Sequence, residues 1–313
     1  MKFMQIKPQK ARGTFKESLF SDPQWWAENK EDGDRRIAQF VGERVRFTGT
    51  RESVSDTGFV EKTANLPHLA YTPPQALDCT VLDGEIVAPF AKNLPGGSSK
   101  HVTAIMGSSP ERAVALQKER GWLEYRVFDC LWYKGLDIRQ HSIQMRRNWA
   151  WEALKIWKNK YAHLLPTYIT TGEKRAAWKR SREGLVFKRD DHTYGDERLW
   201  VKHKKVWTAD VVVMGYKMGK GKYEGRVGSI VFGQDMPAHS DKHSLALREL
   251  GTVRGFDDAT MRELTDKPRM NLNRVFEITH FGREPTGAFR SPQFSRWRDD
   301  KDPKDCVYRE DET

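Results

Sequence analysis

The residues from Lys30 to Arg35 place a candidate nucleophile among charged neighbours within six positions. The stretch reads Lys30-Glu31-Asp32-Gly33-Asp34-Arg35. A lysine amine is nucleophilic only in its neutral form, which neighbouring cations or loss of solvent favour. Asp32 and Arg35 could orient the amine and hold a charged substrate. A solvated turn explains the same residues, because Asp-Gly is a hairpin signal and charge clusters usually lie at surfaces.

The segment that follows predicts a sheet beside this lysine. Residues 36–41 and 44–49 alternate in polarity around Gly42-Glu43, which is typical of a β-hairpin. Lys30 would therefore lie in a turn next to a sheet, which is a rigid position for a nucleophile.

The rest of the first two thirds of the chain mixes helices with strands. Ser109 and Pro110 begin a predicted helix that ends at Gly121, and apolar residues at helical spacing predict a second helix over 143–157. Further expectations are a loose lead-in over 1–24, a strand-turn-strand at 81–87, a flexible loop over 93–100, a helix over 172–182, and strands at 123–132, 185–188 and 200–202.

The character of the sequence changes near residue 206. Strand patterns recur at 209–216, 227–232, 246–253 and 274–279, with one helix at 257–265. Five or so strands and one helix in about 100 residues fit a small oligonucleotide/oligosaccharide-binding (OB) barrel. We therefore expect two domains, 1–205 and 206–313, and an acidic tail after Asp299 that is partly disordered.

Composition indicates which kind of partner and which cellular compartment to expect. The 313 residues include 54 Lys+Arg and 43 Asp+Glu, a net charge of +11, which favours a polyanion such as nucleic acid or an anionic membrane surface. Three scattered cysteines without a CxxC pair argue against structural zinc and fit a reducing compartment. We see no secretory signal and no apolar run that could cross a bilayer, so we expect a cytoplasmic protein without a membrane partner.

Six further stretches follow the lysine motif in a fixed order. They are Thr50-Arg51-Glu52-Ser53, Leu82-Asp83-Gly84-Glu85-Ile86, Tyr125-Arg126-Val127-Phe128-Asp129, Glu183-Gly184-Leu185-Val186-Phe187-Lys188, Trp200-Val201-Lys202-His203-Lys204, and the segment from Arg290 to Lys301. The set resembles the motifs of the ATP-dependent DNA ligases, members of the covalent nucleotidyltransferase superfamily, and it covers nearly the whole chain. The resemblance implies an α+β protein with a nucleotidyltransferase (ATP-grasp-like) domain of antiparallel sheets and helices, followed by an all-β OB-fold barrel.

The resemblance also implies an activity. Lys30 would attack the α-phosphorus of ATP to form a lysyl-AMP, the AMP would pass to a 5′-phosphate at a nick in duplex DNA, and the 3′-OH would then seal the strand. Such steps need positioning and charge neutralisation, which Mg²⁺ or Mn²⁺ would assist. We expect a monomer acting on nicked double-stranded DNA. An RNA ligase or RNA-capping nucleotidyltransferase, and a non-catalytic OB-type nucleic-acid-binding protein, remain alternatives.

The family's site residues transfer to matching positions. The catalytic set is Lys30, Asp32, Lys202 and Lys204, and the nucleotide-binding set is Glu28, Arg35, Glu85, Phe128, Lys188, Arg298 and Lys301. The metal set is Glu183 and Glu85, and the DNA-binding set is Arg51, Arg290, Arg296, Lys217, Lys220 and Lys222. Lys202 and Lys204 alternate along a strand, so both would face the α-phosphate, and their charge would favour the neutral form of Lys30.

Each of these residues alone also has an ordinary structural explanation. The lysine pair could be a solvated strand face, Glu183 a helix-end acid, Glu85 the flank of a hairpin and Phe128 a core residue. The lysines from Lys217 to Lys222 could simply be solubilising.

In the family the final motif closes over ATP and later moves away so that DNA can enter. A hinge within 205–210, at Asp210, would permit this movement. The first two predicted barrel strands are joined only by residues 218–226, which is too short for the long DNA-gripping latch of some minimal ligases. We also expect no large DNA-binding domain before Lys30, so the nick would be held by basic surface.

Overall fold

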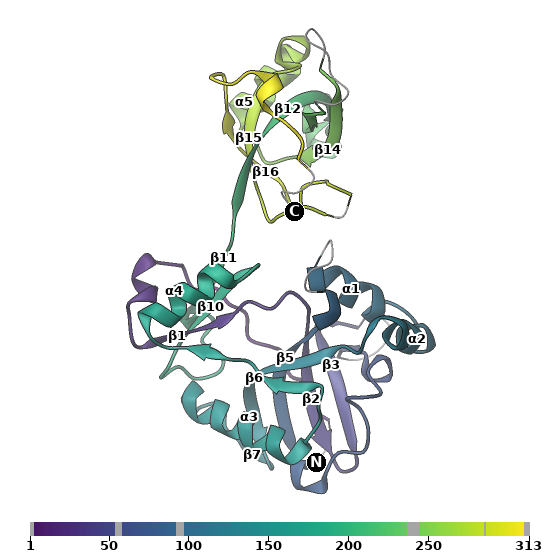
Figure 1. Ribbon diagram of the computed structural model, residues 1–313, viewed down its shortest axis with the longest axis vertical. Helices are drawn as coiled ribbons and strands as arrows, with labels where there is room; N and C mark the ends of the chain where they lie inside the picture. The colour runs from purple at the N-terminus through teal and green to yellow at the C-terminus, as the bar shows by residue number, and fades with distance from the viewer. Residues whose placement is uncertain (1–2, 54–57, 92–96, 237–244, 285, 310–313) are drawn as a thin grey trace. The chain divides into compact units, whose positions relative to one another are not determined.

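The computed structural model describes residues 3–53, 58–91, 97–236, 245–284 and 286–309. The chain forms two compact units, Met1–Lys204 and Lys205–Thr313, each of which has its own core. Figure 1 shows their elements.

The first unit contains a four-stranded antiparallel sheet that carries the lysine motif at the end of one strand. Its order is β11 (Trp200–Lys204), β10 (Gly184–Arg189), β1 (Trp25–Asn29) and β9 (Thr167–Tyr168). Helix α4 (Thr171–Arg180) and the short 3-10 helix η1 (Glu17–Phe20) pack with this sheet. One sheet face thereby becomes an apolar core, built from Ala27, Leu185, Phe187, Val201 and their neighbours.

A second, seven-stranded sheet makes up the rest of the first unit. Its order is β4 (Phe59–Glu61), β3 (Arg44–Glu52), β2 (Asp34–Val41), β5 (Thr80–Val87), β6 (Glu124–Tyr133) and β7 (Leu136–Asp137), with β8 (Ala162–Leu164) parallel to β6. Three helices pack around it: α1 (Gly97–Met106), α2 (Pro110–Arg120) and α3 (Ile143–Trp157).

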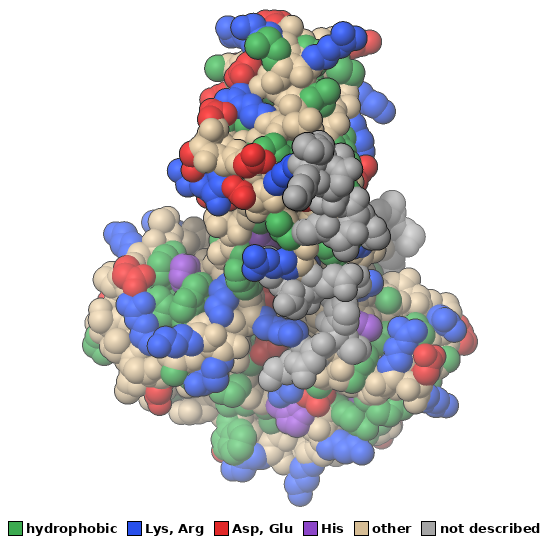
Figure 2. Space-filling model, turned by 45° about the horizontal axis from the view of Figure 1, so that its top comes forward, with side chains coloured by type: hydrophobic (Ala, Val, Ile, Leu, Met, Phe, Trp, Pro, Cys, Tyr) green, Lys and Arg blue, Asp and Glu red, His purple; other side chains and the backbone are tan. Residues whose placement is uncertain are grey.

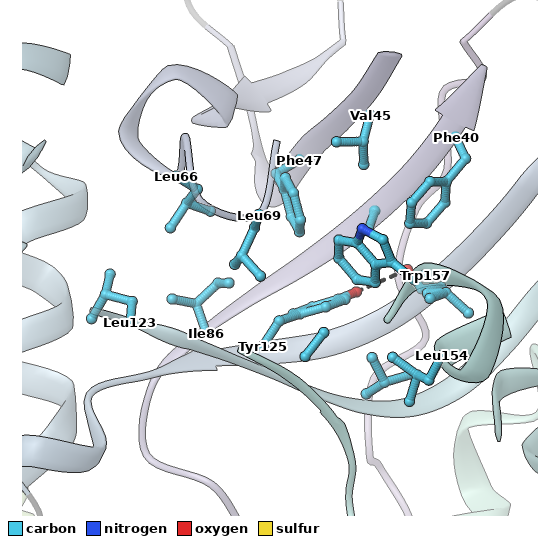
Figure 3. Close-up of a cluster of buried hydrophobic side chains, with 14 of the residues drawn as sticks. Phe40, Val45, Phe47, Leu66, Leu69, Ile86, Leu123, Tyr125, Leu154 and Trp157 are labelled. Atoms are coloured by element: carbon cyan, nitrogen blue, oxygen red, sulfur yellow. Dashed lines mark hydrogen bonds between the residues drawn. The ribbon is translucent and has the colours of Figure 1, made fainter. Parts of the chain in front are cut away.

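The main core of this unit lies between the seven-stranded sheet and its helices. Figure 3 shows Trp157 of α3 beside Phe40 and Tyr125 of the sheet. The Tyr125 and Trp157 ring centroids are 6.5 Å apart, and the Tyr125 hydroxyl donates to the carbonyl of Leu82 at 3.0 Å. Packing of large apolar rings at this density makes the sheet a rigid support for the residues on its other face.

Among its described residues, the second unit contains a five-stranded antiparallel sheet and one α-helix. The strand order is β14 (Leu247–Val253), β13 (Val227–Asp235), β12 (Trp207–Met218), β15 (Val275–His280) and β16 (Gln293–Trp297), and the helix is α5 (Asp258–Asp266). Short 3-10 helices complete the two units: η2 (Thr63–Asn65), η3 (Gln75–Leu77), η4 (Pro89–Ala91), η5 (Glu197–Leu199), η6 (Gly221–Tyr223), η7 (Pro268–Asn271) and η8 (Pro303–Asp305).

The helices with clear terminal signals are confirmed. Ser109 caps α2 by accepting the Arg112 N–H at 3.4 Å, and Gly121 follows its last residue. Helix α3 spans 143–157, as the apolar spacing predicts, and the hairpin of β2 and β3 is also confirmed.

Two local predictions are wrong. Residues 81–87 form one continuous strand, β5, and Gly84 lies inside it. A Cβ on this residue would be 2.6 Å from the Arg126 carbonyl oxygen and from the Tyr125 ring. Close approach of a neighbouring strand, rather than a turn, explains this glycine. Of the predicted loop over 93–100, residues 97–100 begin helix α1, and 93–96 lie outside the described residues.

The described residues of the lead-in and of the segment after Asp299 make more packing contacts than the sequence predicts. In the lead-in, Ile6 and Phe20 are buried, and the Gly13 N–H donates to the Trp200 carbonyl at 2.9 Å. After Asp299, the described part of the tail buries Cys306, whose carbonyl accepts the Asp235 N–H at 2.7 Å. Neither segment has periodic apolar residues, so the sequence alone offered no sign of this packing.

Candidate active site

Strand register gathers charged residues on one face of the four-stranded sheet. Glu28 pairs with Val186, which pairs with Lys202, and Lys188 lies two residues along from Val186. Paired residues, and residues two apart on one strand, share a face. The face opposite the apolar core therefore carries a row of charges: Glu28, Lys188, Lys202 and Lys204.

Lys30 continues this arrangement just beyond the end of β1. Its N–H donates to the Gly184 carbonyl at 3.0 Å, and Gly184 pairs on its other side with Lys204. The Lys30 Nζ lies 3.2 Å from Oε2 of Glu183, and the two side chains are 23% and 13% exposed. A solvated turn would leave both side chains in water, so the local geometry instead describes a half-buried amine beside a carboxylate.

The seven-stranded sheet contributes a second group of polar residues in the same unit. Arg35 on β2 pairs with Glu85 on β5, and its guanidinium binds Asp83 through two contacts, at 2.9 Å and 2.5 Å. The Arg35 Cζ lies 5.2 Å from the ring centroid of Phe128 and 5.4 Å from that of Trp200. Because Trp200 belongs to β11, these contacts join the two sheets around the polar residues.

Glu85 is a carboxyl with incomplete charge compensation. Burial raises the pKa of Glu85 to about 8, and Asp34 and Asp83 act in the same direction, whereas Lys30 and Arg35 oppose the shift. A carboxyl in this environment holds its proton at neutral pH until further positive charge or hydrogen-bond donors arrive. It is therefore suited to receive a cation or a hydroxyl group.

A cluster of buried charged side chains, Glu28, Arg147 and Lys188, lies beside Phe128. Oε1 of Glu28 is 2.5 Å from Nη1 of Arg147, and Oε2 is 2.6 Å from the Lys188 Nζ, with all three side chains at most 8% exposed. The Lys188 Nζ also lies 4.5 Å from the Phe128 ring centroid. Burial lowers the pKa of Lys188, although Glu28 opposes the shift. The Glu28 carboxylate is thus held in one orientation from two sides.

Several members of this site were not predicted. Arg147 lies on α3, Tyr194 donates its hydroxyl to Asp83 at 2.7 Å, and Arg146 forms a fully buried ion pair with Asp129 at 2.7 Å. Two adjacent arginines within an otherwise amphipathic helix were a usable signal for Arg146 and Arg147. Tyr194 lies between strands in a segment without a pattern, and nothing in the sequence connects it to Asp83.

Two further predicted residues, Asp32 and Arg51, lie near α1 and near the end of β3, respectively. The Asp32 carboxylate accepts the Ser99 N–H at 3.4 Å, in the first turn of α1, and Arg51 is exposed near the end of β3. The motif glycine has a steric reason, since a Cβ on Gly33 would lie 2.0 Å from the Ile86 carbonyl oxygen. Gly33 therefore lets the lysine motif run close to β5.

The residues present fit a magnesium ion. No group of three or more His, Cys, Asp or Glu within the described ranges is arranged to hold a metal by itself. Mg²⁺ usually binds one or two carboxylates together with water and substrate phosphates. Glu183 beside Lys30, and Glu85 with its raised pKa, supply carboxylates of this kind, and Glu85 lacks the positive charge that such an ion would bring.

In the second unit, the final motif is held by carboxylates. The Arg298 Nη1 lies 3.0 Å from Oδ1 of Asp210, and the Lys301 Nζ lies 3.3 Å from its Oδ2. Asp210 itself is inside β12, where it pairs with Glu277 of β15. A hinge at Asp210 would have to break this pairing, whereas the division between the units falls earlier, at Lys204–Lys205.

The remaining predicted DNA-binding residues of this unit lie at several places. The Arg296 Nη2 is 3.4 Å from Oε2 of Glu277, and the Arg290 N–H donates to the Gly282 carbonyl at 2.9 Å. Lys217, Lys220 and Lys222 are exposed at the end of β12 and in the connection to β13. That connection is short and contains only η6, as the sequence indicates.

Among the residues that the structure describes, no helix combines the length and apolar character needed to cross a bilayer.

Comparison with known proteins gives a consistent family. The model of the ATP dependent DNA ligase domain matches residues 8–204. The multifunctional non-homologous end joining protein LigD of Mycolicibacterium smegmatis is 26% identical over an alignment of 317 positions, which covers 91% of this chain and 37% of that protein. Across the curated relatives compared, the chain spans between 23% and 57% of their length.

Solved structures share the fold. A Lig E DNA ligase superposes with a TM-score of 0.64 at 16% identity, covering 94% of this chain and all of that one. The ligase domain of Mycobacterium tuberculosis LigD superposes with a TM-score of 0.51 at 22% identity, covering 99% and 100%. The predicted fold class, a nucleotidyltransferase domain followed by an OB fold, is thereby confirmed. With the family model matching well over half of its residues, this chain belongs to the ATP-dependent DNA ligase domain family.

Proposed function

We propose that this protein is an ATP-dependent DNA ligase that seals 5′-phosphate/3′-OH nicks in duplex DNA. The observation that carries the proposal is the Lys30 amine, which lies 3.2 Å from Glu183 at the edge of a sheet face lined with Lys188, Lys202 and Lys204. A nucleophilic amine among cations is what attack on a phosphate of ATP requires.

The first step follows from this chemistry. The neutral Lys30 amine attacks the α-phosphorus of ATP, a P–N bond forms, and the bond to the β-phosphate oxygen breaks. Pyrophosphate leaves with the electron pair, and the proton lost by the amine passes to solvent. Lys202 and Lys204 stabilise the charge that builds on the α-phosphate oxygens.

The other residues of the first unit bind and orient the nucleotide in this proposal. Phe128 stacks on the adenine, and Glu28, oriented by Arg147 and Lys188, accepts a hydrogen bond from its amino group. Glu85 accepts from the ribose hydroxyls. Arg35, bound to Asp83, supports the ring of Phe128 from beside it.

A magnesium ion held by Glu183 and Glu85 would neutralise phosphate charge when bound. The remaining steps are displacements at phosphorus. An oxygen of the DNA 5′-phosphate attacks the AMP phosphorus and releases Lys30, and the 3′-OH then attacks the activated 5′-phosphate and expels AMP. The enzyme acts as a monomer and grips the nick through cations at its surface, among them the exposed Arg51 and Arg296 and the half-buried Arg290.

The test is transfer of label from ATP carrying ³²P at the α-phosphate, in the presence of Mg²⁺. We expect an acid-labile label on the wild-type protein that nicked DNA releases, no label on Lys30→Ala, and normal labelling of Lys118→Ala, an exposed lysine on α2. Absence of label on the wild type would refute the proposal. Release by nicked RNA but not nicked DNA, or labelling by GTP instead of ATP, would assign the chain to the RNA-directed branch of the superfamily.

A further inference from the structure

A stack of three aromatic rings lies on the face of β11 opposite Lys202 and Lys204. The imidazole of His203 is stacked between Phe15, at 3.5 Å between ring centroids and 1° between ring planes, and Trp178, at 4.0 Å and 13°. Phe187 and Phe20 extend the cluster, with Phe20 5.1 Å from Phe187. The three stacked rings come from the N-terminal lead-in, from β11 and from α4.

The position of His203 in β11 relates this stack to the two lysines. His203 lies between Lys202 and Lys204, so its side chain points to the opposite face of the sheet from theirs. β11 is an edge strand, paired through its ladder only with β10 among the named strands. The first unit ends at Lys204, which is the last residue of this strand. An edge strand at the end of a unit needs a second restraint to hold its side chains in place.

The N-terminal lead-in supplies part of that restraint. The Gly13 N–H donates to the Trp200 carbonyl at the start of β11, two residues before Phe15 reaches His203. A Cβ on Gly13 would lie 2.2 Å from the Arg198 carbonyl oxygen, which shows how closely this segment approaches the residues before β11. The lead-in thus fastens both the backbone and the central side chain of the strand.

We propose that His203 is a positioning residue for Lys202 and Lys204, acting through its stack with Phe15 and Trp178. The proposal rests on the proposed function, in which both lysines stabilise charge on the transferring phosphate. The stack holds β11 against α4 and the lead-in, so that the two ammonium groups stay at fixed positions on the other face. The lead-in thereby contributes to catalytic geometry although it supplies no reacting group.

The experiment compares three variants of the full chain. His203→Ala removes the central ring, His203→Phe keeps a flat ring in the stack, and His68→Ala is the matched control. His68 is also packed against aromatic rings in the first unit, 4.6 Å from Trp122, but it lies outside β11. Each variant is tested for labelling rate at saturating ATP, for the KM of ATP, for thermal unfolding, and for hydrogen–deuterium exchange of residues 200–204.

We expect His203→Ala to label about 10-fold more slowly at saturating ATP with little change in KM, because misplaced cations weaken stabilisation of the transition state. Exchange across 200–204 should rise. His203→Phe should restore both quantities, and His68→Ala should lower the unfolding temperature without either effect. If His203→Ala does not fold, Phe15→Ala, which removes one ring of the stack, takes its place with the same expectations.

Wild-type labelling and exchange in His203→Ala, or failure of folded His203→Phe to restore them, would overturn the positioning role. Equal slowing in His68→Ala would also do so, by showing that loss of stability alone is sufficient. Exchange is measured without ATP, so it reports on the stack even if the wild type is not labelled, a result that would count against the proposed function alone.

Discussion

At the scale of single residues, the folded protein disfavours the ionised form of Glu85. Burial raises the pKa of Glu85 to about 8, while the same carboxyl has its ordinary pKa in the unfolded chain. The folded protein therefore holds a proton that the unfolded chain releases above pH 4.5. Stability contributed by this group is complete at low pH and is lost as the pH rises from about 4.5 to 8.

Glu85→Gln should remove this pH dependence. As the pH is raised from 5 to 8, the free energy of unfolding of the wild type should fall relative to that of the variant by on the order of 2 kcal/mol. This is less than the full pKa shift implies, because the side chain keeps some access to solvent. Labelling by ATP should fall at the same time, since the carboxylate is lost. Urea unfolding at both pH values measures the effect, with exposed Glu119→Gln as the control. An unchanged stability difference between the two pH values would contradict the assignment.

At the scale of elements, the segment after β16 is anchored by ion pairs with residues of its own unit. Asp210 binds Arg298 and Lys301, and Asp299 binds Arg274 through two contacts, at 2.7 Å and 3.0 Å. The resemblance assigns Arg298 and Lys301 to the β- and γ-phosphates of ATP, which are present only in the first step. A carboxylate partner keeps such cations folded on the unit when no phosphate is bound.

Arg298→Ala and Lys301→Ala should therefore impair self-adenylation more than later steps. We expect labelling by ATP to fall by about 100-fold, a loss comparable to removing one preorganised charge, with a much smaller loss in sealing a nick that already carries AMP. Single-turnover assays on both substrates measure the ratio. Exposed Arg269→Ala of the same unit should change neither. Equal losses in the two assays would show that these residues do not act specifically on ATP.

At the scale of the whole molecule, nearly all of the net charge of +11 belongs to the first unit, whose residues 1–204 contain 35 Lys+Arg and 25 Asp+Glu. Figure 2 shows Lys and Arg side chains on the surface of each, interspersed with Asp and Glu. Lys217, Lys220 and Lys222 are close together in sequence at one end of β12 and are exposed. Contacts between such lysines and phosphates depend on salt, because each contact releases counterions from DNA.

Replacing these three lysines by alanine should weaken binding of nicked duplex DNA by about 10-fold at 0.1 M salt and should reduce the salt slope by two to three. Fluorescence anisotropy across a salt series measures both quantities. A matched variant with Lys118, Lys155 and Lys160 replaced loses the same charge from exposed positions of the first unit and should keep the slope. If the two triple variants behave alike, general charge rather than this cluster holds the DNA.

Local signals in the sequence determined much of the fold and the identity of the motifs. Ser109, Gly121 and the apolar spacing of 143–157 act through neighbouring residues, and so the helices they mark could be predicted from the sequence alone. The order of Lys30, Glu85, Phe128, Glu183, Lys202 and Lys204 indicated the family for the same reason, since motif order is a property of the chain.

Only the tertiary structure decided how these residues meet. Arg147 is 119 positions from Glu28, Glu183 is 153 positions from Lys30, and Phe15 is far from His203 in sequence, yet each pair is in contact. Gly84 appeared as a turn because the strand that presses against it is remote in sequence. Strand pairing and burial depend on such distant partners, and no local pattern specifies them.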